Sequence, residues 1–140
     1  MHQHIKFFFI IFFLTYNLFG RVLPSDIIWN ENETGYYTIK DNNIILVSTK
    51  GKADKTILPS SKINNINIES FTFSKSKNKI LLFTKSVKVW RYNTRGDYWV
   101  YDFKKDNIQK LGRNMSGSSL MFAKFSPNEN FVAYVSKEEN

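Results

Sequence analysis

The protein has 140 residues, no cysteine, and 20 Lys and Arg against 12 Asp and Glu. It is therefore at most one ordinary domain, without disulfides, cysteine-ligated metals or a thiol nucleophile. The 42% hydrophobic content is too high for a disordered chain, and only three alanines argue against a helical bundle. The net charge of +8 raises nucleic-acid binding as a function, but the lysines are dispersed among Asn, Ser and Asp in turn-like segments. We therefore expect a solvated basic surface and no nucleic-acid partner.

The first 20 residues differ in composition from the rest of the chain. A weakly basic start is followed by an apolar run without charge at 7–14. This pattern is typical of a secretory signal helix, and the run is too short for a membrane span of about 20 residues. We predict a signal peptide at 1–20 cleaved after Gly20, which leaves 21–140 as an exported domain, secreted or periplasmic. An uncleaved anchor through 7–23 and a buried core strand are the alternatives.

After residue 25 the chain consists of short β-favouring runs separated by turn residues. The predicted strands fall into three groups, which lie at 27–29, 36–39, 44–48 and 55–58, then at 70–74, 79–83, 98–103 and 107–111, and finally at 121–126 and 131–135. No segment beyond the signal has a sustained period of 3.6 residues, so the fold class is predicted to be all-β.

The groups of strands are related to one another. The segment Phe73–Phe83 aligns without gaps on Phe125–Val135, 52 residues later, which is typical of β-propeller blades. In the first of these segments Ser and Asn replace the usual Pro-Asp-Gly, so they must form its turn. Residues 27–140 have room for a partial propeller, about two blades and the first hairpin of a third. Because a blade needs neighbours, we expect the chain to be truncated. A small independent sandwich or barrel is the alternative.

The most distinctive segment contains Trp90 and Arg91. Its pattern predicts a strand ending at these two residues, a polar connection that contains Gly96, and a second strand at 98–103. An arginine at the end of an apolar strand face either extends to solvent or presents its donors to a carbonyl or carboxylate group. The residues alone leave both interpretations open.

Several motifs together are similar to one known family. The order of Trp90-Arg91, Tyr98-Trp99-Val100-Tyr101-Asp102 and Phe125–Val135 resembles the N-terminal β-propeller of dipeptidyl peptidase IV-type exopeptidases in the prolyl oligopeptidase superfamily. Upstream, Trp29 and the segment 42–47 are similar to the first blade of that family. The resemblance extends over about residues 27–140.

The resemblance implies a part of an exported serine-type dipeptidyl peptidase, which gates and binds substrates rather than cleaving them. At the position of Arg91, the family has an arginine that bonds the carbonyl of the second substrate residue and helps orient a glutamate pair for the free amino terminus. The implied partners are peptides with a free N-terminus, a C-terminal α/β-hydrolase domain missing from this sequence, and a second copy of the parent enzyme. The competing hypothesis is a non-enzymatic secreted propeller that binds protein or carbohydrate.

The sequence offers no catalytic residues of its own. It has no Gly-x-Ser-x-Gly motif, and its only histidines, His2 and His4, lie in the predicted signal. We therefore expect the chain to be inactive alone, and we predict neither a cofactor nor a metal. Asn32 and Asn114 fit the N-glycosylation pattern in predicted loops.

Overall fold

The computed structural model describes residues 27–137. These residues form ten strands and one short 3₁₀ helix, which lie in the order β1 (Ile28–Trp29), β2 (Gly35–Lys40), β3 (Asn43–Ser48), β4 (Lys55–Leu58), η1 (Ser60–Ile63), β5 (Ser70–Phe73), β6 (Lys79–Val89), β7 (Tyr92–Asp102), β8 (Asn107–Lys110), β9 (Leu120–Phe125) and β10 (Val132–Ser136). The all-β prediction is confirmed for this part of the chain, and none of its helices is long and apolar enough to cross a membrane. The predicted signal peptide at 1–20 lies outside the residues that the structure describes.

The first sheet is an antiparallel meander with the strand order β1-β2-β3-β4. Strands β2 and β3 are joined by the two residues Asp41 and Asn42, whose φ angles are 50° and 59°. Two-residue hairpins require such left-handed conformations, and Asn and Asp adopt them more easily than other residues with a side chain. Local turn chemistry therefore fixes the register of this hairpin.

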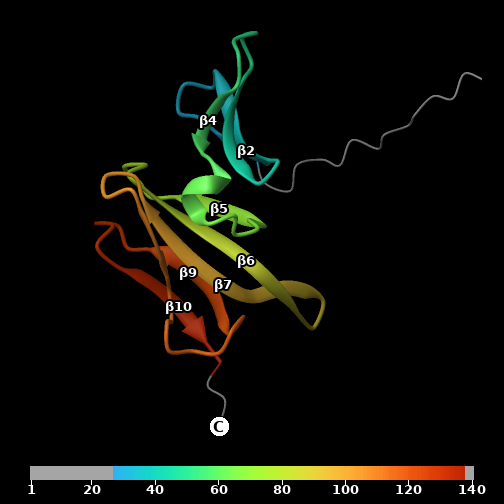
Figure 1. Ribbon diagram of the computed structural model, residues 1–140, viewed down its shortest axis with the longest axis vertical. Coiled ribbons are helices and arrows are strands. Elements are labelled where there is room, and N and C mark those ends of the chain that lie inside the picture. The colour runs from blue at the N-terminus through green and yellow to red at the C-terminus, as the bar shows by residue number, and fades with distance from the viewer. Residues whose placement is uncertain (1–26, 138–140) are drawn as a thin grey trace, which may run out of the picture.

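The second sheet contains two units. Strands β5, β6, β7 and β8 form a four-stranded antiparallel unit, because β8 pairs with the outer edge of β7. The hairpin of β9 and β10 joins this unit where Arg95 and Gly96 pair with Met121 and Leu120. Two four-stranded units and a further hairpin are the arrangement that the sequence predicts (Figure 1).

The main hydrophobic core lies between the two four-stranded units. Its buried members come from both sheets and from the segment that connects them, and they are Ile44, Leu58, Ile63, Ile68, Phe71, Ile80, Leu82 and Tyr101. Tyr37 and Phe73 extend this contact, with ring centroids 4.8 Å apart. Each unit thus covers one face of its neighbour, as consecutive blades do.

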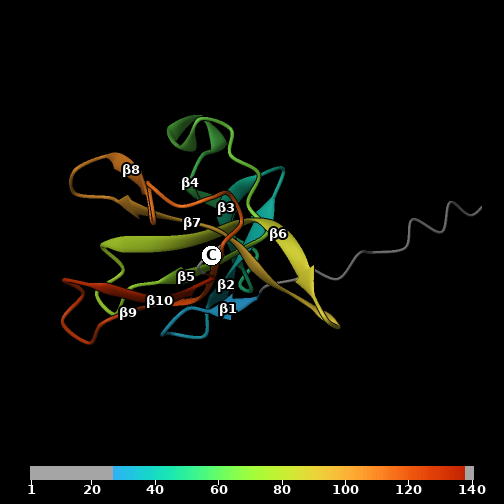
Figure 2. The same cartoon turned by 90° about the horizontal axis from the view of Figure 1, so that it is seen from below.

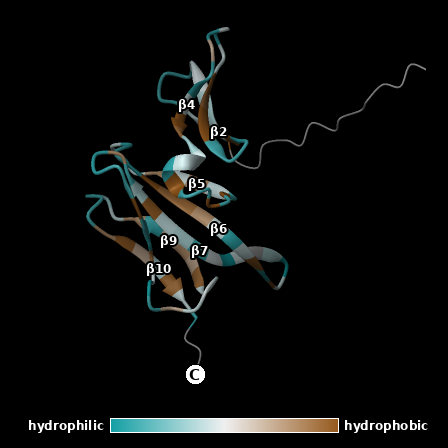
Figure 3. Cartoon of the chain, viewed as in Figure 1, coloured by the Kyte–Doolittle hydropathy of each residue, from teal (hydrophilic) through white to brown (hydrophobic). Residues whose placement is uncertain are grey.

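The hairpin of β9 and β10 leaves apolar side chains uncovered. Phe131 is 72% exposed, Phe122 59% and Val135 50%, and β10 lies at the edge of its sheet. Hydrophobic stretches on β9 and β10 are visible in Figure 3. The described sheets therefore do not close into the self-contained sandwich or barrel that was the alternative.

The predicted 52-residue repeat is confirmed by identical hydrogen bonds in two turns. Between β5 and β6, the amide of Ser74 donates to the Lys79 carbonyl and the amide of Lys77 to the Ser74 carbonyl, both at 2.9 Å. The Ser74 hydroxyl accepts the Lys79 amide at 3.2 Å. The same three bonds recur between β9 and β10, where the residues are Ser126, Glu129 and Phe131. Serine thus stabilises the turn that lacks Pro-Asp-Gly.

A third copy of this turn joins β1 and β2. The amide of Asn30 donates to the Gly35 carbonyl at 3.0 Å, and the amide of Glu33 to the Asn30 carbonyl at 3.1 Å. The fourth turn residue has a positive φ in each copy, 52° at Glu33, 57° at Lys77 and 60° at Glu129. The sequence did not reveal this copy, because Asn30 and Gly35 replace the residues found in the other two.

These first turns of the three units contact one another in succession. Lys77 lies 3.3 Å from the Glu31 carboxylate in the first unit. The Glu129 carboxylate of the third unit accepts the Ser76 amide and hydroxyl, and the Glu129 carbonyl accepts Lys79 at 2.8 Å. The three units are therefore held in register along one edge of the molecule.

Candidate functional site: the arm of the second sheet

The outer parts of β6 and β7, residues 85–96, form a hairpin that we call the arm, and it is two-stranded beyond Arg95 and Gly96, which also pair with β9. The arm projects beyond the rest of its sheet (Figures 1 and 2). Its turn consists of Trp90 and Arg91, since Val89 and Tyr92 are its last paired residues. Trp90 is 94% exposed, Arg91 is exposed, and no ion pair to Arg91 occurs within residues 27–137. The structure thus places Arg91 in the turn at the outer end of the arm, with an exposed side chain.

One sequence expectation for this segment is wrong. Gly96 does not belong to a polar connection, because β6 and β7 each continue for 11 residues and turn only at Trp90 and Arg91. The strand that returns from the turn has polar residues at 93–95 before Gly96, so this part lacks the apolar alternation by which a strand is recognised. Residues 93–96 therefore look like a loop in the sequence.

The turn of the arm is strained. Trp90 has a φ of 60°, a left-handed conformation that costs residues with a side chain roughly 1 kcal/mol or more. Asn-Gly is the usual choice for a two-residue hairpin turn. Strained residues of this kind cluster at binding sites, where the surrounding structure holds them. The turn is therefore built against local preference, next to the residue that the sequence singled out.

Two β-bulges direct the arm away from its sheet. The register shifts between Thr84 and Val87, where Lys85 has a φ of 49°, and again between Val87 and Lys88. A bulge bends its strand and increases the local twist. The two shifts therefore set the angle at which the arm leaves the sheet.

The base of the arm is packed around Gly96. A Cβ atom at this position would lie 2.4 Å from the Phe83 ring and 2.7 Å from the Thr84 carbonyl oxygen. The hydroxyl of Thr84, which is fully buried, accepts the indole N–H of Trp99 at 3.2 Å. Glycine is therefore required here by an aromatic ring that lies across the strand, not by a turn.

A buried carboxylate lies beside this glycine. Asp97 is 2% exposed, and its Oδ1 atom accepts the Ser118 amide at 2.9 Å and the Lys110 ammonium group at 3.0 Å. A buried charge is tolerated only when it is paired and hydrogen-bonded. The Ser118 hydroxyl in turn donates to the Lys85 carbonyl at 2.7 Å. The connection between β8 and β9 is thereby bonded to both strands of the arm at its base.

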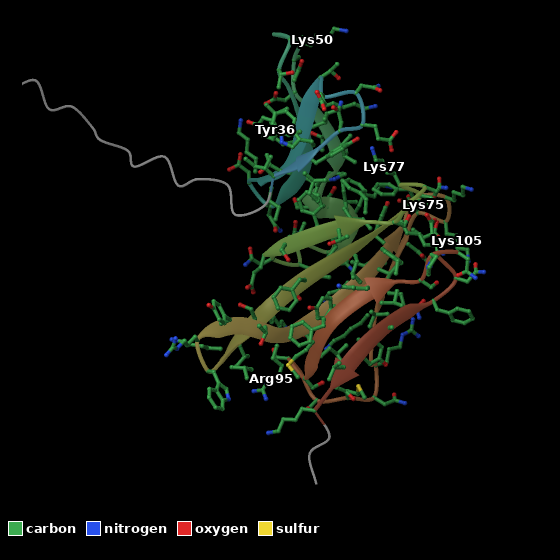
Figure 4. All side chains as sticks on the ribbon, turned by 180° about the vertical axis from the view of Figure 1, so that it is seen from behind. Tyr36, Lys50, Lys75, Lys77, Arg95 and Lys105 are labelled. Carbon is green, nitrogen blue, oxygen red and sulfur yellow. The ribbon has the colours of Figure 1, made fainter. Side chains whose placement is uncertain are left out.

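The opposite end of the second sheet has a different polar cluster. Asp106 accepts hydrogen bonds from Lys62 and from the Tyr101 hydroxyl, and these bonds lower the pKa of Asp106. Burial, with a smaller contribution from Asp106, raises the pKa of Tyr101 to about 12. Figure 4 shows Lys75, Lys77 and Lys105 gathered at this end, and Arg95 at the end that carries the arm. The Asp106 cluster links η1 to the turn after β7 and does not contact the arm.

The two predicted glycosylation positions lie in exposed turns. Asn32 is in the turn between β1 and β2, and Asn114 is in the connection between β8 and β9. Within residues 27–137, no group of three or more His, Cys, Asp or Glu side chains is arranged to hold a metal ion. No pattern in the sequence indicates that Asp97, Lys110 and Ser118 form a group. An acidic residue between Gly96 and an aromatic run was the one available signal.

Residues 74–139 match the model of the family described as "Dipeptidyl peptidase IV (DPP IV) N-terminal region". Residues 74–139 are homologous to the DPP IV N-terminal region. The match contains the whole arm, with Arg91 at its turn and Asp97 at its base.

Individual relatives agree with this DPP IV match. Dipeptidyl aminopeptidase B of Saccharomyces cerevisiae is 30% identical over 110 residues, which are 74% of this chain and 13% of the yeast protein. Prolyl endopeptidase FAP of Homo sapiens is 24% identical over 107 residues, 76% of this chain and 14% of that protein. The chain therefore spans about one seventh of these DPP IV-related proteins.

A solved structure supports the fold. The crystal structure of Porphyromonas gingivalis dipeptidyl peptidase 4 superimposes with a TM-score of 0.64 at 22% identity, over 78% of this chain and 16% of that one. With the sheet order described above, this match confirms a partial β-propeller of the DPP IV type.

Proposed function

We propose that residues 21–140 are the N-terminal propeller segment of an exported serine-type dipeptidyl peptidase, which gates and binds peptide substrates while another domain cleaves them. The observation that carries the proposal is the position of Arg91, at the turn of a projecting arm inside the segment that matches the DPP IV N-terminal region. Two of the matching proteins, dipeptidyl aminopeptidase B of yeast and dipeptidyl peptidase 4 of Porphyromonas gingivalis, carry names of this activity class and so support the proposal.

In this proposal Arg91 binds the substrate and takes no part in bond cleavage. Its guanidinium donates to the carbonyl of the second substrate residue, while a glutamate pair elsewhere in the full-length protein holds the free amino terminus. Fixing both groups places the scissile bond two residues from the end of the peptide, which is catalysis by positioning. An α/β-hydrolase domain supplies the catalytic serine, and a second copy of the parent enzyme is a further proposed partner.

The proposal is tested with Arg91→Ala in the full-length peptidase. Loss of a charge-assisted hydrogen bond to substrate is worth about 1.5–3 kcal/mol, so kcat/KM for dipeptide-releasing substrates falls roughly 10- to 100-fold. Lys88→Ala is the matched control, because Lys88 is an exposed cation on the same arm. Equal kcat/KM values for the Arg91 variant and the wild type would remove Arg91 from the substrate site.

Export is proposed from the first 20 residues and is tested separately. N-terminal sequencing of the mature protein from its native host is expected to begin at Arg21. A mature protein that retains residues 7–23 and stays in the membrane fraction would favour the anchor over the cleaved signal.

A further inference from the structure

The arm needs support from outside itself. Beyond the pairs that Arg95 and Gly96 form with β9 it is a two-stranded ribbon, and such ribbons are at best marginally stable alone in water. Its outer end buries little, since Trp90 is 94% exposed and Tyr92 73%. The contacts that hold the arm in one orientation must therefore lie at its base.

The contacts at the base converge on Asp97. Through Oδ1 its carboxylate accepts Lys110 at 3.0 Å from β8 and the Ser118 amide at 2.9 Å from the following connection. The ammonium group of Lys85, on the other strand of the arm, lies 4.0 Å from Oδ2. The Ser118 hydroxyl also donates to the Lys85 carbonyl, so Ser118 is bonded both to β7, through Asp97, and to β6, through Lys85.

On β6, the other strand, the base of the arm has one further contact. The Glu69 carboxylate accepts the Ser86 amide at 2.8 Å, inside the first bulge. Asp97 and Glu69 thus hold the two strands at the level where the arm bends. Asp97 is the buried one of the two carboxylates.

We propose that Asp97 is a positioning residue for Arg91: held by Lys110 and Ser118, its carboxylate fixes the direction in which the arm leaves the sheet. This inference rests on the proposed function, because Arg91 must bind substrate for its position to matter. A buried ion pair is often no more stabilising than apolar residues of the same size. The pair of Asp97 and Lys110, with the bond from Ser118, instead holds β7, β8 and the β8–β9 connection in one fixed arrangement.

The length of the arm makes its base important. Asp97 lies six positions after Arg91 in the chain, so at about 3.3 Å per residue the turn lies roughly 20 Å from the carboxylate. A rotation of about 10° at the base would move the turn by about 3 Å, which is the length of a hydrogen bond. A small change at Asp97 is therefore enough to take the guanidinium out of reach of a carbonyl group.

The test is a double-mutant cycle in the full-length peptidase. Asp97→Asn keeps the shape of the side chain and removes its charge, and we expect kcat/KM to fall about tenfold. If Asp97 acts through Arg91, the same substitution in the Arg91→Ala background causes no further loss. Additive losses in the double variant would overturn the inference, because they would mean that Asp97 affects activity independently of the arm.

Amide hydrogen exchange gives a second readout that does not depend on activity. In Asp97→Asn, exchange at residues 86–95 is expected to accelerate at least tenfold, while the strands of the first sheet keep their wild-type rates. Asp106→Asn is the matched control: it also removes an acidic group bonded to a lysine, yet it leaves exchange in the arm and kcat/KM unchanged. Unchanged exchange in the arm of Asp97→Asn would overturn the inference.

The outcomes separate this inference from the proposed function. A full-length protein without dipeptidyl peptidase activity would contradict the proposed function, and exchange in the arm would still decide whether Asp97 orients it. An Arg91-dependent activity with an additive Asp97 effect would contradict the inference alone. If Asp97→Asn does not fold, Lys110→Met removes one donor and leaves the carboxylate in place, with the same cycle and the same expected pattern.

Discussion

The hairpin between β2 and β3 and the arm between β6 and β7 occupy the same position in two consecutive units, yet they are built differently. The first turns at Asp41 and Asn42, which suit left-handed backbone, whereas the second turns at Trp90 and Arg91, which do not. In the first, the turn residue Asn42 itself bonds the connection to the next unit, accepting the Ile68 amide and donating to the Ile66 carbonyl.

In the arm the corresponding bond has moved from the turn to the base. Asp97 accepts the Ser118 amide, as Asn42 accepts the Ile68 amide, and the arm extends beyond that point. In the first unit the hairpin turn itself bonds to the connection that leads to the next unit. In the second unit the equivalent bond is formed at the base of the arm, and the turn at Trp90 and Arg91 takes no part in it. The comparison distinguishes a hairpin that bonds two units together from one that we propose to bind substrate, and three substitutions test this distinction.

The largest effect is expected at the base of the arm. Gly96→Val places side-chain atoms against the Phe83 ring and the Thr84 carbonyl oxygen, and we expect a loss of about 3 kcal/mol in the free energy of unfolding. Denaturant titration of the purified protein measures it. Gly117→Ala is the control, since no atom lies within 4 Å of its added Cβ, and it stays within about 0.5 kcal/mol of wild type. Equal stabilities for the two variants would contradict the packing described at the base.

An intermediate effect is expected in the structural hairpin. Asn42→Gly keeps the left-handed backbone and removes the two side-chain bonds to Ile66 and Ile68, so stability falls by about 2 kcal/mol. The midpoint of chemical unfolding measures this loss, and kcat/KM of the full-length protein stays at the wild-type value. A drop in kcat/KM as large as that of Arg91→Ala would mean that the two hairpins share one role.

The smallest effect is expected at the turn of the arm. Trp90→Asn relieves the left-handed strain, and because the indole is 94% exposed little burial is lost, so stability rises by roughly 0.5–1 kcal/mol. A higher melting temperature than wild type is the readout. A lower one would show that the indole packs against another part of the full-length protein.

Much of the fold followed from local pattern. The β-favouring runs, their turns and the 52-residue repeat could be read from the sequence because each depends on residues within a few positions of one another. The resemblance to DPP IV-type propellers rested on such runs, and it is the reason that Arg91 was predicted to bind substrate. The third copy of the first turn escaped notice, since Asn30 and Gly35 form it with different side chains.

By itself, the sequence determined that this is an all-β chain of repeated four-stranded units with an arginine at a strand end. Only the tertiary structure decided that Gly96 lies within a strand under the Phe83 ring, that this strand begins at Tyr92 directly after the turn, and that Asp97 is paired with Lys110 and Ser118. The physical reason is distance along the chain: strand preference acts between neighbours, whereas bulges and buried ion pairs are settled by segments that meet only after folding.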